Sequence, residues 1–215
     1  MNILITAGPT REHLDPVRFL SNRSTGKMGF AIAQAAAERG HNVTLITGPV
    51  SLPTPQGVAR IDVTSACDML AAVERALQNC DALVMSAAVA DWRPEQTADA
   101  KLKKREMNPT LRLVPNPDIL KTIMPQKGHR VIVGFAAETG DPTAEAQRKL
   151  TAKGLDLIVA NDVTMSGAGF AVETNVVTLI SRDAPPQALP LLSKIEVGRV
   201  LIQWIEAHTA GFRKS

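Results

Sequence analysis

The sequence predicts an α/β protein with a mostly parallel sheet and helices on both of its faces. Short apolar runs of strand length alternate with segments of helical period, which is the pattern of βαβ units. Several of these runs lack polar and apolar alternation, as expected for parallel strands that are covered on both faces. A chain of 215 residues is long enough for one such domain with an extension.

The expected elements can be placed in order along the chain. The first strand is expected at residues 3–5, followed by a helix at 28–39 that Gly40 ends in the left-handed conformation. After strands at 43–47 and 58–63, Thr64 or Ser65 should cap a second helix, whose apolar residues recur at helical spacing. Ser193 should cap the final helix, which runs to about residue 208. The other expected elements are strands at 81–87, 131–135, 155–160 and 176–180 and a helix at about 143–153.

A long connection separates the strand at 81–87 from the strand at 131–135. Its more than 40 residues exceed the length of a simple crossover and include a basic cluster and a β-prone piece at 111–114. A helix is expected after Asn116, with Pro117 at its first helical position. We interpret residues of about 92–116 as a flap or dimerisation arm within a single Rossmann-like domain that spans residues 1–215.

Composition excludes several classes of function. A net charge of +3 is too small for a surface that collects nucleic acid or anionic lipid. The longest apolar run falls far short of the ~20 residues that span a bilayer, and the amino terminus lacks a signal-peptide pattern. Cys67 and Cys80 fit neither a disulfide framework nor a zinc site. We therefore expect reduced thiols and a cytoplasmic protein.

Candidate binding residues follow the ends of predicted strands. In an open parallel sheet, ligands bind outside the carboxyl ends of the strands. Small or polar residues stand at four such ends, at 7–10, 87–91, 136–139 and 161–162. Any one of these loops is most simply a turn that ends a strand, whereas the four together favour a binding site.

The segment at 21–29 stands just before the first long helix, where free N–H groups and the helix dipole favour an anion. It fails as a P-loop, because Ser21 and Met28 stand where that motif needs Gly and Ser or Thr. It also lacks the third glycine of a dinucleotide fingerprint. The segment is therefore either a helix cap with a closely packed glycine or an anion loop, in which Asn22 donates to an oxyanion and Arg18 supplies charge.

Two groups of basic residues are further candidates. Residues 101–105 hold four cations in five positions, which indicates either a solvated face or a lid over a polyphosphate. Lys149 and Lys153 lie one helical turn apart, so a bound anion would relieve their repulsion, although an ion pair between Glu145 and Lys149 explains part of the pattern. With the isolated Asp91, this inventory suits chemistry at a nucleotide phosphate, where positioning and charge stabilisation suffice.

Six ordered motifs together resemble the bacterial phosphopantothenate–cysteine ligases, also called phosphopantothenoylcysteine synthetases, which form the ligase domain of the bifunctional coenzyme A biosynthesis protein. The motifs are ITAGPTRE at 5–12, SNxSTGKMG at 21–29, AAVAD at 87–91, KxKK at 101–104, GFAAET at 134–139 and AND at 160–162. The resemblance covers nearly the whole chain.

This resemblance implies a ligase that joins 4′-phosphopantothenate to L-cysteine through an acyl-cytidylate, using CTP and Mg²⁺ and releasing pyrophosphate and CMP. Members of the family form homodimers, and many are fused to a flavin-dependent phosphopantothenoylcysteine decarboxylase. Because this chain starts directly at the first strand, we expect a free-standing ligase or an excised domain, without flavin and with the decarboxylase as a linked or separate partner. The residues alone do not decide between CTP and ATP.

The resemblance also implies roles for residues that match its motifs. Asn22 and Lys101 are the expected catalytic residues, and Asn22 with Arg18 would bind phosphopantothenate. Asp91 would face the nucleotide and its metal. The nucleotide site is expected to comprise Met85, Ser86, Ala87, Asp91, Lys101, Pro117, Asp118, Ile119, Leu120, Phe135, Lys149 and Lys153.

Two alternatives remain open at this point. An oxidoreductase that binds NAD(P) is disfavoured by the missing third glycine and by the lack of an acidic residue after the second strand. It would be stabilised by nicotinamide cofactors, whereas a ligase of the kind described would be stabilised by CTP with Mg²⁺. A non-catalytic nucleotide-binding or dimer scaffold protein would bind CTP but release no pyrophosphate when phosphopantothenate is added.

Overall fold

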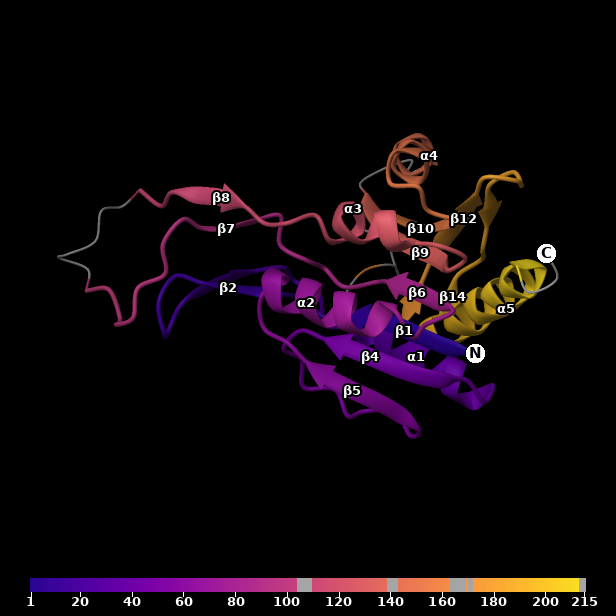
Figure 1. Ribbon diagram of the computed structural model, residues 1–215, viewed down its shortest axis with the longest axis horizontal. Helices are drawn as coiled ribbons and strands as arrows, with labels where there is room; N and C mark the ends of the chain where they lie inside the picture. Colours follow the sequence, from indigo (N-terminus) through magenta and orange to yellow (C-terminus); the bar gives the residue numbers. More distant parts are fainter. Residues whose placement is uncertain (104–109, 139–142, 163–168, 170–171, 213–215) are drawn as a thin grey trace.

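The computed structural model describes residues 1–103, 110–138, 143–162, 169 and 172–212. Its centre is one eight-stranded sheet (Figure 1). In spatial order the strands are β13 (Gln187–Ala188), β12 (Val177–Ser181), β10 (Leu157–Asp162), β9 (Val131–Glu138), β6 (Ala82–Met85), β1 (Asn2–Ala7), β4 (Asn42–Thr47) and β5 (Val58–Asp62). The strands from β10 to β5 pair in parallel, and β12 and β13 are antiparallel. The predicted mostly parallel α/β fold is confirmed.

Helices cover both faces of this sheet. Residues of β1 alternate between two cores: Ile3 and Ile5 pack in one, and Leu4 packs in the other. The first core includes residues of α1 (Lys27–Glu38) and α5 (Lys194–Phe212). The second includes residues of α2 (Ala66–Leu77), α3 (Ile119–Ile123) and α4 (Thr143–Ala152), and a short 3-10 turn, η1 (Met124–Gln126), follows α3. Both faces of the central strands are therefore buried, as their unbroken apolar runs predict.

The chain winds outward from β1 in both directions. It passes from β1 to β4 and β5 on one side and then returns to β6, β9 and β10 on the other. Thr6 of β1 accordingly has Ile46 of β4 as one neighbour and Met85 of β6 as the other. In such a doubly wound sheet the connections after β1 and β6 diverge, which leaves a crevice at the carboxyl ends of these strands.

Two helices begin with the caps that the sequence predicts. Ser65, rather than Thr64, is the N-cap of α2 and forms a capping box with Asp68. At the start of α5, the Ser193 hydroxyl and N–H both donate to the Glu196 carboxylate, 2.6 and 2.8 Å away. The helix predicted to end near residue 208 extends to Phe212.

The predicted start of α3 was wrong by two positions. The helix begins at Ile119, and Asp118 is its N-cap, with a side chain that accepts a hydrogen bond from the Lys121 N–H at 3.1 Å. Pro117 therefore precedes the cap instead of occupying the first helical position. The Asp118 carboxylate satisfies a free N–H group of the first turn, which proline is unable to do.

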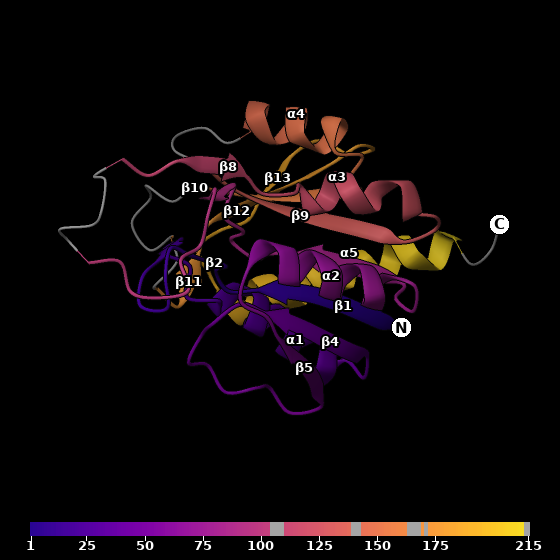
Figure 2. The ribbon, with the colours of Figure 1, turned by 60° about the vertical axis from the view of Figure 1, so that its left-hand side comes forward.

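Part of the chain leaves the sheet as an arm, visible on the left of Figures 1 and 2. It contains the antiparallel pair β7 (Trp92–Pro94) and β8 (Leu113–Pro115). Beside it lies a hairpin that the sequence did not reveal, β2 (Arg11–His13) with β3 (Phe19–Ser21). Within the basic run, Lys104 and Arg105 lie outside the described residues. A third small pair joins β11 (Thr174–Asn175) to β14 (Leu192–Ser193).

The length and hydropathy of the helices bear on whether the chain crosses a membrane. Among the residues that the structure describes, no helix combines the length and the apolar character needed to cross a bilayer.

Candidate functional site

A cavity of about 330 Å³ lies at the carboxyl edge of the sheet. Its walls come from the start of α1, the loop after β6, the end of β9, and single residues of α4, β10, β11 and α5. Segments far apart in the sequence thus meet at the carboxyl ends of β1 and β6, where the connections that follow these two strands run in opposite directions. This is the position at which open α/β sheets bind their ligands.

One wall is the first turn of α1. Gly26 is the N-cap, has a φ of 79° and carries no side chain that could cap the helix. Gly29 lets this turn approach the sheet, because a Cβ there would stand 2.5 Å from the Ala7 Cβ and 2.7 Å from the Ser86 Oγ. The N–H groups of the first turn have no partner within a helix, and with the positive end of the dipole they favour a bound anion.

Another part of the wall is the loop of residues 86–91, whose backbone is held by neighbouring loops. The Ala88 N–H donates to the Gly8 carbonyl at 2.9 Å, and the Ala90 N–H donates to the Thr10 Oγ1 at 2.9 Å. The Asn22 side chain donates to the Ala88 carbonyl, also at 2.9 Å. Asn22 therefore lies directly against this loop, and the small side chains of the loop leave room for a flat ligand.

Asp91 ends this loop and lines the cavity with an exposed side chain. Asn116 fixes its backbone, because the Asn116 N–H donates to the Asp91 carbonyl at 2.8 Å and the Asn116 amide donates to the Ala90 carbonyl at 2.8 Å. Within the described ranges, no three His, Cys, Asp or Glu side chains gather in a way that could hold a metal ion. Asp91 is a side chain that could hold a Mg²⁺ ion, which commonly binds through one or two carboxylates together with phosphate oxygens and water.

Three lysines from three helices line the same cavity: Lys27 of α1, Lys149 of α4 and Lys194 of α5. Lys27 forms an ion pair with Glu173, and Lys149 lies 3.7 Å from Glu145. The hydrogen bond from Lys27 holds the pKa of Glu173 below its ordinary value. Two of the three positive charges are therefore partly offset by carboxylates, and a bound anion would compete with those carboxylates for the same ammonium groups.

Lys194 is the most buried of the three, with only 5% of its surface exposed. Its ammonium group donates to the carbonyls of Gly169, Val172 and Thr174. Burial lowers the pKa of Lys194, the Glu173 carboxylate raises it, and the nearby Lys27 lowers it further. Lys194 thus fixes the chain before β11 as part of the cavity wall and places positive charge behind it.

Asn161 of β10 supplies an unsatisfied polar atom. Its residue surface is 9% exposed, and its Oδ1 is the single buried side-chain oxygen or nitrogen, among the described residues, without a hydrogen-bond partner. A buried acceptor without a donor is costly. Because Asn161 lines the cavity, an N–H or O–H group of a ligand would supply the missing donor.

The structure brings together some of the residues expected at a nucleotide site. Ser86, Ala87, Asp91, Phe135 and Lys149 line the cavity. Met85, at the end of β6, packs its side chain into the core that also contains α2, so only its backbone, the part that the family resemblance assigns to the nucleotide base, is a candidate for contact.

A second group lies around the start of α3 and does not line the cavity. It contains Pro117, Asp118, Ile119, Leu120 and Lys153. Lys153 Nζ lies 3.5 Å from Asp118 Oδ2, and Ile119 is buried in the core. These residues therefore lie near one another but outside the cavity.

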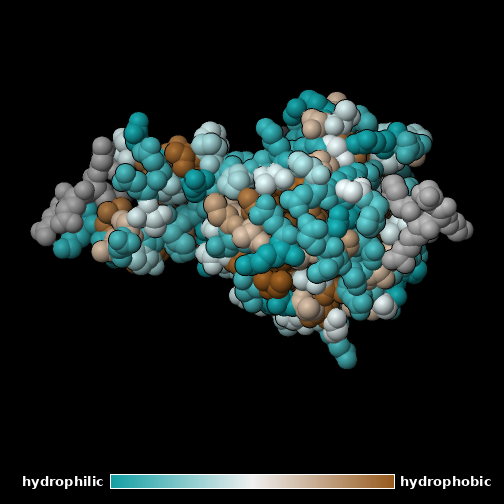
Figure 3. Space-filling view, viewed as in Figure 1, coloured by the Kyte–Doolittle hydropathy of each residue, from teal (hydrophilic) through white to brown (hydrophobic). Residues whose placement is uncertain are grey.

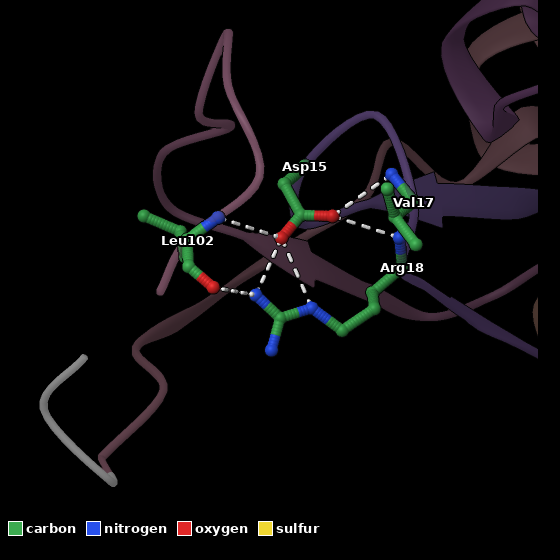
Figure 4. A network of polar contacts seen from close by, with 4 residues as sticks. All are labelled: Asp15, Val17, Arg18 and Leu102. Atoms are coloured by element: carbon green, nitrogen blue, oxygen red, sulfur yellow. Dashed lines mark hydrogen bonds and ion pairs between the residues drawn. The ribbon is translucent and has the colours of Figure 1, made fainter. Parts of the chain in front are cut away.

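Two more candidates lie on or beside the arm. Lys101 is exposed, and the Arg18 guanidinium contacts the Asp15 carboxylate and the Leu102 carbonyl (Figure 4). Neither Lys101 nor Arg18 lines the cavity of its own chain.

The cavity residues to which sequence reasoning assigned no individual role include Lys27, Asn161, Asn175 and Lys194. Lys194 could have been noticed in the sequence, because a cation in the first turn of a helix is unfavourable next to the positive end of the helix dipole. Such a residue is a candidate for a role other than helix stability. Lys27 and Asn161 stood within quoted motifs. The isolated Asn175 offered no such signal.

The fold and the cavity define a class: a doubly wound α/β domain with a cavity at the carboxyl edge of its sheet that three lysines line. Comparison with known proteins identifies the group within this class. Residues 1–209 match the model of the DNA/pantothenate metabolism flavoprotein C-terminal domain, and the chain belongs to this family. The family resemblance seen in the sequence motifs is confirmed.

Curated relatives include the coenzyme A biosynthesis bifunctional proteins CoaBC of Bacillus subtilis strain 168 and Escherichia coli K12. The former is 49% identical over 207 residues, which cover 96% of this chain and 51% of the relative. The latter is 49% identical over 209 residues, with coverages of 95% and 51%. The chain thus spans about half the length of the curated relatives it matches.

Solved structures agree. The C-terminal domain of a CoaBC protein superposes with a TM-score of 0.82 at 42% identity, covering 96% of this chain and 94% of that one. The DNA/pantothenate metabolism flavoprotein of Streptococcus pneumoniae gives a TM-score of 0.84 at 25% identity, covering 97% and 99%. A Cab2 mutant in complex with phosphopantothenate-cysteine has a TM-score of 0.79 and 16% identity, which shows a shared fold.

Proposed function

We propose that this chain is a phosphopantothenate–cysteine ligase domain of coenzyme A biosynthesis. The observation that carries the proposal is the convergence of Lys27, Lys149 and Lys194 with the start of α1 on one cavity at the carboxyl edge of the sheet. Cations and helix N–H groups stabilise the charge that develops on a phosphate during transfer. Relatives at 49% identity that are named for coenzyme A biosynthesis support the same function.

The proposed reaction has two steps and needs no protein nucleophile. The carboxylate of 4′-phosphopantothenate attacks the α-phosphorus of CTP, so that pyrophosphate leaves and an acyl-cytidylate forms. The amine of L-cysteine then attacks the acyl carbon, and CMP leaves with the bonding electrons as the amide forms. Positioning of the two substrates and neutralisation of phosphate charge are the contributions that the protein supplies.

The described residues suit this division of labour. Asp91 would hold Mg²⁺ together with phosphate oxygens, and the ion would neutralise part of the triphosphate charge. Asn22, which contacts the loop of residues 86–91, would meet the phosphopantothenate half and the acyl-cytidylate. The Asn161 Oδ1 would accept a hydrogen bond from the nucleotide, and Lys149 would contact its phosphates. CTP rather than ATP is proposed on the family resemblance alone. The base would be selected by backbone contacts, which any residue type can make, so the side chains do not indicate which base binds.

The arm supports a homodimer as the working form. Five apolar residues of the arm and of the adjacent β2–β3 hairpin expose between 41% and 58% of their surface: Val17, Phe19, Trp92, Leu111 and Leu113. Brown areas on the arm at the left of Figure 3 show apolar surface of this kind. Exposed apolar groups on an extended segment favour association with another copy, and most soluble oligomers are symmetric.

The proposal extends to the setting of the enzyme. Cys67 and Cys80 are both free, which fits the reduced thiols of a cytoplasmic protein. Because the bifunctional relatives are about twice as long as this chain, a linked or separate phosphopantothenoylcysteine decarboxylase is the proposed partner.

One experiment separates this function from its alternatives. The chain is mixed with phosphopantothenate, Mg²⁺ and CTP, ATP or no nucleotide, and pyrophosphate is followed before and after L-cysteine is added. We expect pyrophosphate with CTP before cysteine and CMP after it. A protein that is stabilised by CTP but releases no pyrophosphate is a binding protein, and stabilisation by nicotinamide cofactors alone would indicate an oxidoreductase.

Two substitutions test the assigned residues. Asn22→Asp places a carboxylate beside an anionic intermediate and should strongly impair turnover. It also loses the hydrogen bond to the Ala88 carbonyl, so the melting temperature should fall slightly, as expected for one exposed hydrogen bond. Lys101→Gln should slow acyl-cytidylate formation, the step in which phosphate charge is neutralised. Wild-type rates in either variant would remove that residue from the proposed site.

A further inference from the structure

Asp15 lies in the turn between β2 and β3, and its carboxylate accepts five hydrogen bonds. Its Oδ1 accepts from the backbone N–H groups of Val17 and Arg18, at 2.9 and 2.8 Å. Its Oδ2 accepts from the Nε and Nη2 of Arg18, at 3.0 and 2.5 Å, and from the Leu102 N–H at 3.2 Å. Figure 4 shows the carboxylate between the guanidinium and the backbone of Leu102.

The same two side chains hold both polar groups of the Leu102 backbone. Asp15 accepts from its N–H, and the Arg18 Nη2 donates to its carbonyl at 3.1 Å. A residue whose N–H and carbonyl are both bonded on one side is fixed in rotation about the chain axis, as in a paired strand. We call this pair of contacts from Asp15 and Arg18 to Leu102 the clamp. Because both contacts are to backbone atoms, they fix the orientation of the chain whatever the Leu102 side chain is.

Two further contacts fix the register of the segment that leads to Leu102. The Thr97 hydroxyl donates to the His13 carbonyl at 3.0 Å, and the Ala98 N–H donates to the Leu14 carbonyl at 2.9 Å. Residues 97–102 therefore run alongside residues 13–15. The Asp15 clamp is the last of these contacts and lies directly between Lys101 and Lys103.

The location of this clamp is unusual for a charged group. Asp15 has no exposed surface, although it lies in the turn of a two-stranded hairpin, and the paired Arg18 side chain is 38% exposed. The hydrogen bonds from Arg18 hold the pKa of Asp15 well below its ordinary value. Charge-assisted hydrogen bonds of this kind are short and directional, which suits them to fixing a segment in one geometry.

We propose that Asp15 is a positioning residue for the ligase reaction: with Arg18 it clamps the Leu102 backbone and thereby directs Lys101 toward the nucleotide phosphates. The proposal rests on the proposed function and deepens it. In an extended segment, alternate side chains share a face, so one clamp at Leu102 sets the face of both Lys101 and Lys103. A lysine has four rotatable side-chain bonds, and fixing its backbone removes part of the entropy that it would otherwise lose on contact with phosphate.

The variant Asp15→Asn tests the clamp without a large change of shape. An amide is uncharged and has only one accepting oxygen, so its NH₂ group meets a donor at one of the two positions and the hydrogen bonds at the other position lose their charge assistance. The Leu102 N–H therefore has either no acceptor or a weaker one. Glu95→Gln is the matched control, because it neutralises a carboxylate of the arm, whose Oε2 lies 3.4 Å from the Arg112 Nη1 in an exposed ion pair. Such an exposed pair contributes little to stability.

The first measurement is hydrogen exchange at the Leu102 amide, which needs no activity. We expect exchange at least tenfold faster in Asp15→Asn than in the wild type or Glu95→Gln, because a donor that loses its acceptor is exposed to solvent. Equal exchange in all three proteins would overturn the clamp.

The second measurement is the single-turnover rate of acyl-cytidylate formation in a double-mutant cycle. We expect Asp15→Asn to slow this step by about tenfold in the wild-type background and by less than about twofold in the Lys101→Gln background. Melting temperature and dimer content should match those of Glu95→Gln. Equal, additive losses in both backgrounds would overturn positioning through Lys101 and leave a structural role only.

The two measurements also distinguish this inference from the proposed function. A wild-type chain that forms no acyl-cytidylate overturns the ligase assignment, and with it the positioning role, while the exchange result still decides whether the clamp exists. An active wild type with an additive cycle retains the ligase and removes the role of Asp15.

Discussion

Gly29 of α1 lies against Ala7 of β1 so closely that a Cβ on Gly29 would stand 2.5 Å from the Ala7 Cβ. This contact brings the first turn of the helix to the carboxyl end of the central strand. The same missing Cβ leaves space for the Ser86 Oγ, which donates to the Thr6 carbonyl at 2.6 Å. One glycine thus supports both the packing of α1 and the shape of the cavity.

Replacing Gly29 with alanine should therefore reduce both stability and ligand binding. The added methyl group meets a side chain and the strand, and overpacking of this kind costs about 1–3 kcal/mol. Urea unfolding should show the loss, and the rise in melting temperature on addition of CTP with Mg²⁺ should shrink. Gly40→Ala is the control: Gly40 has a φ of 77° and no atoms near its missing Cβ, so alanine there should reduce stability but keep the CTP response.

Replacing Asn161 with alanine should separate stability from binding. The Oδ1 of Asn161 has no partner to lose, so the free energy of unfolding should change by less than about 1 kcal/mol. Stabilisation by CTP should fall because the ligand loses an acceptor. Asn42→Ala, at the opposite end of the sheet, should keep the full CTP response. A CTP response in Asn161→Ala equal to that of the wild type would show that the nucleotide does not use this acceptor.

Lys149 and Lys153 should differ in their effect on nucleotide binding. Lys149 lines the cavity, whereas Lys153 pairs with Asp118 outside it. Lys149→Gln should weaken CTP binding by about tenfold, as expected for loss of one charged hydrogen bond, and Lys153→Gln should weaken it less. Calorimetric titration of both variants with CTP and Mg²⁺ measures the difference. An equal or larger loss in Lys153→Gln would place the triphosphate on the side of α3.

Trp92 should contribute to dimer formation through the arm. It lies at the start of β7 with 53% of its surface exposed. Tryptophan residues at interfaces often carry a large share of the binding energy, so Trp92→Ser should raise the dimer dissociation constant by at least about tenfold. Analytical ultracentrifugation across a concentration series measures this constant. Exposed Leu191, which lies near the start of α5, offers a control in Leu191→Ser, and a wild-type chain that sediments as a monomer would refute the dimer.

Acid should destabilise the fold mainly at pH values below the ordinary pKa of carboxyl groups, which is about 4. Each carboxyl group with a resolved shift among the described residues has a lowered pKa: Asp15, Glu38, Asp68, Glu145, Glu173, Glu196 and Glu206. The unfolded chain therefore binds more protons near pH ~4, and the free energy of unfolding falls as pH decreases from there. Urea unfolding from pH ~2.5 to ~7 should show this decline, with a near plateau above pH ~5. A main loss between pH ~7 and ~5 would instead indicate a histidine, since His is the side chain that ordinarily titrates there.

Local sequence signals predicted much of the fold. The buried strands β1, β4, β6, β9 and β10 were expected from unbroken apolar runs, and the cap of α2 was narrowed to Thr64 or Ser65. The hairpin of β2 and β3 gave no such signal, because each strand has three residues and neither is wholly apolar. The start of α3 was misplaced because proline at the first helical position predicts a start at residue 117, whereas aspartate as the N-cap gives a start at residue 119.

The candidate site was predicted in part for the same reason. Motifs at strand ends contain Ser86, Asp91 and Phe135, and the direction of the parallel strands places them at one edge of the sheet. Lys194 was missed because its partners are backbone carbonyls of a segment that precedes it by about 20 residues, and no side-chain pattern marks them.

The sequence by itself determined the class of fold, the family and the segments from which a site could be built, because apolar period, helix caps and motif spacing depend on neighbours along the chain. Only the tertiary structure decided which cations meet. Lys27, Lys149 and Lys194 share a cavity because three helices pack on the two faces of one sheet, whereas Lys153 turns to Asp118 and Arg18 to Asp15. The energy of an ion pair depends on the distance between the two charges in space, and the order of charges along the chain does not determine that distance.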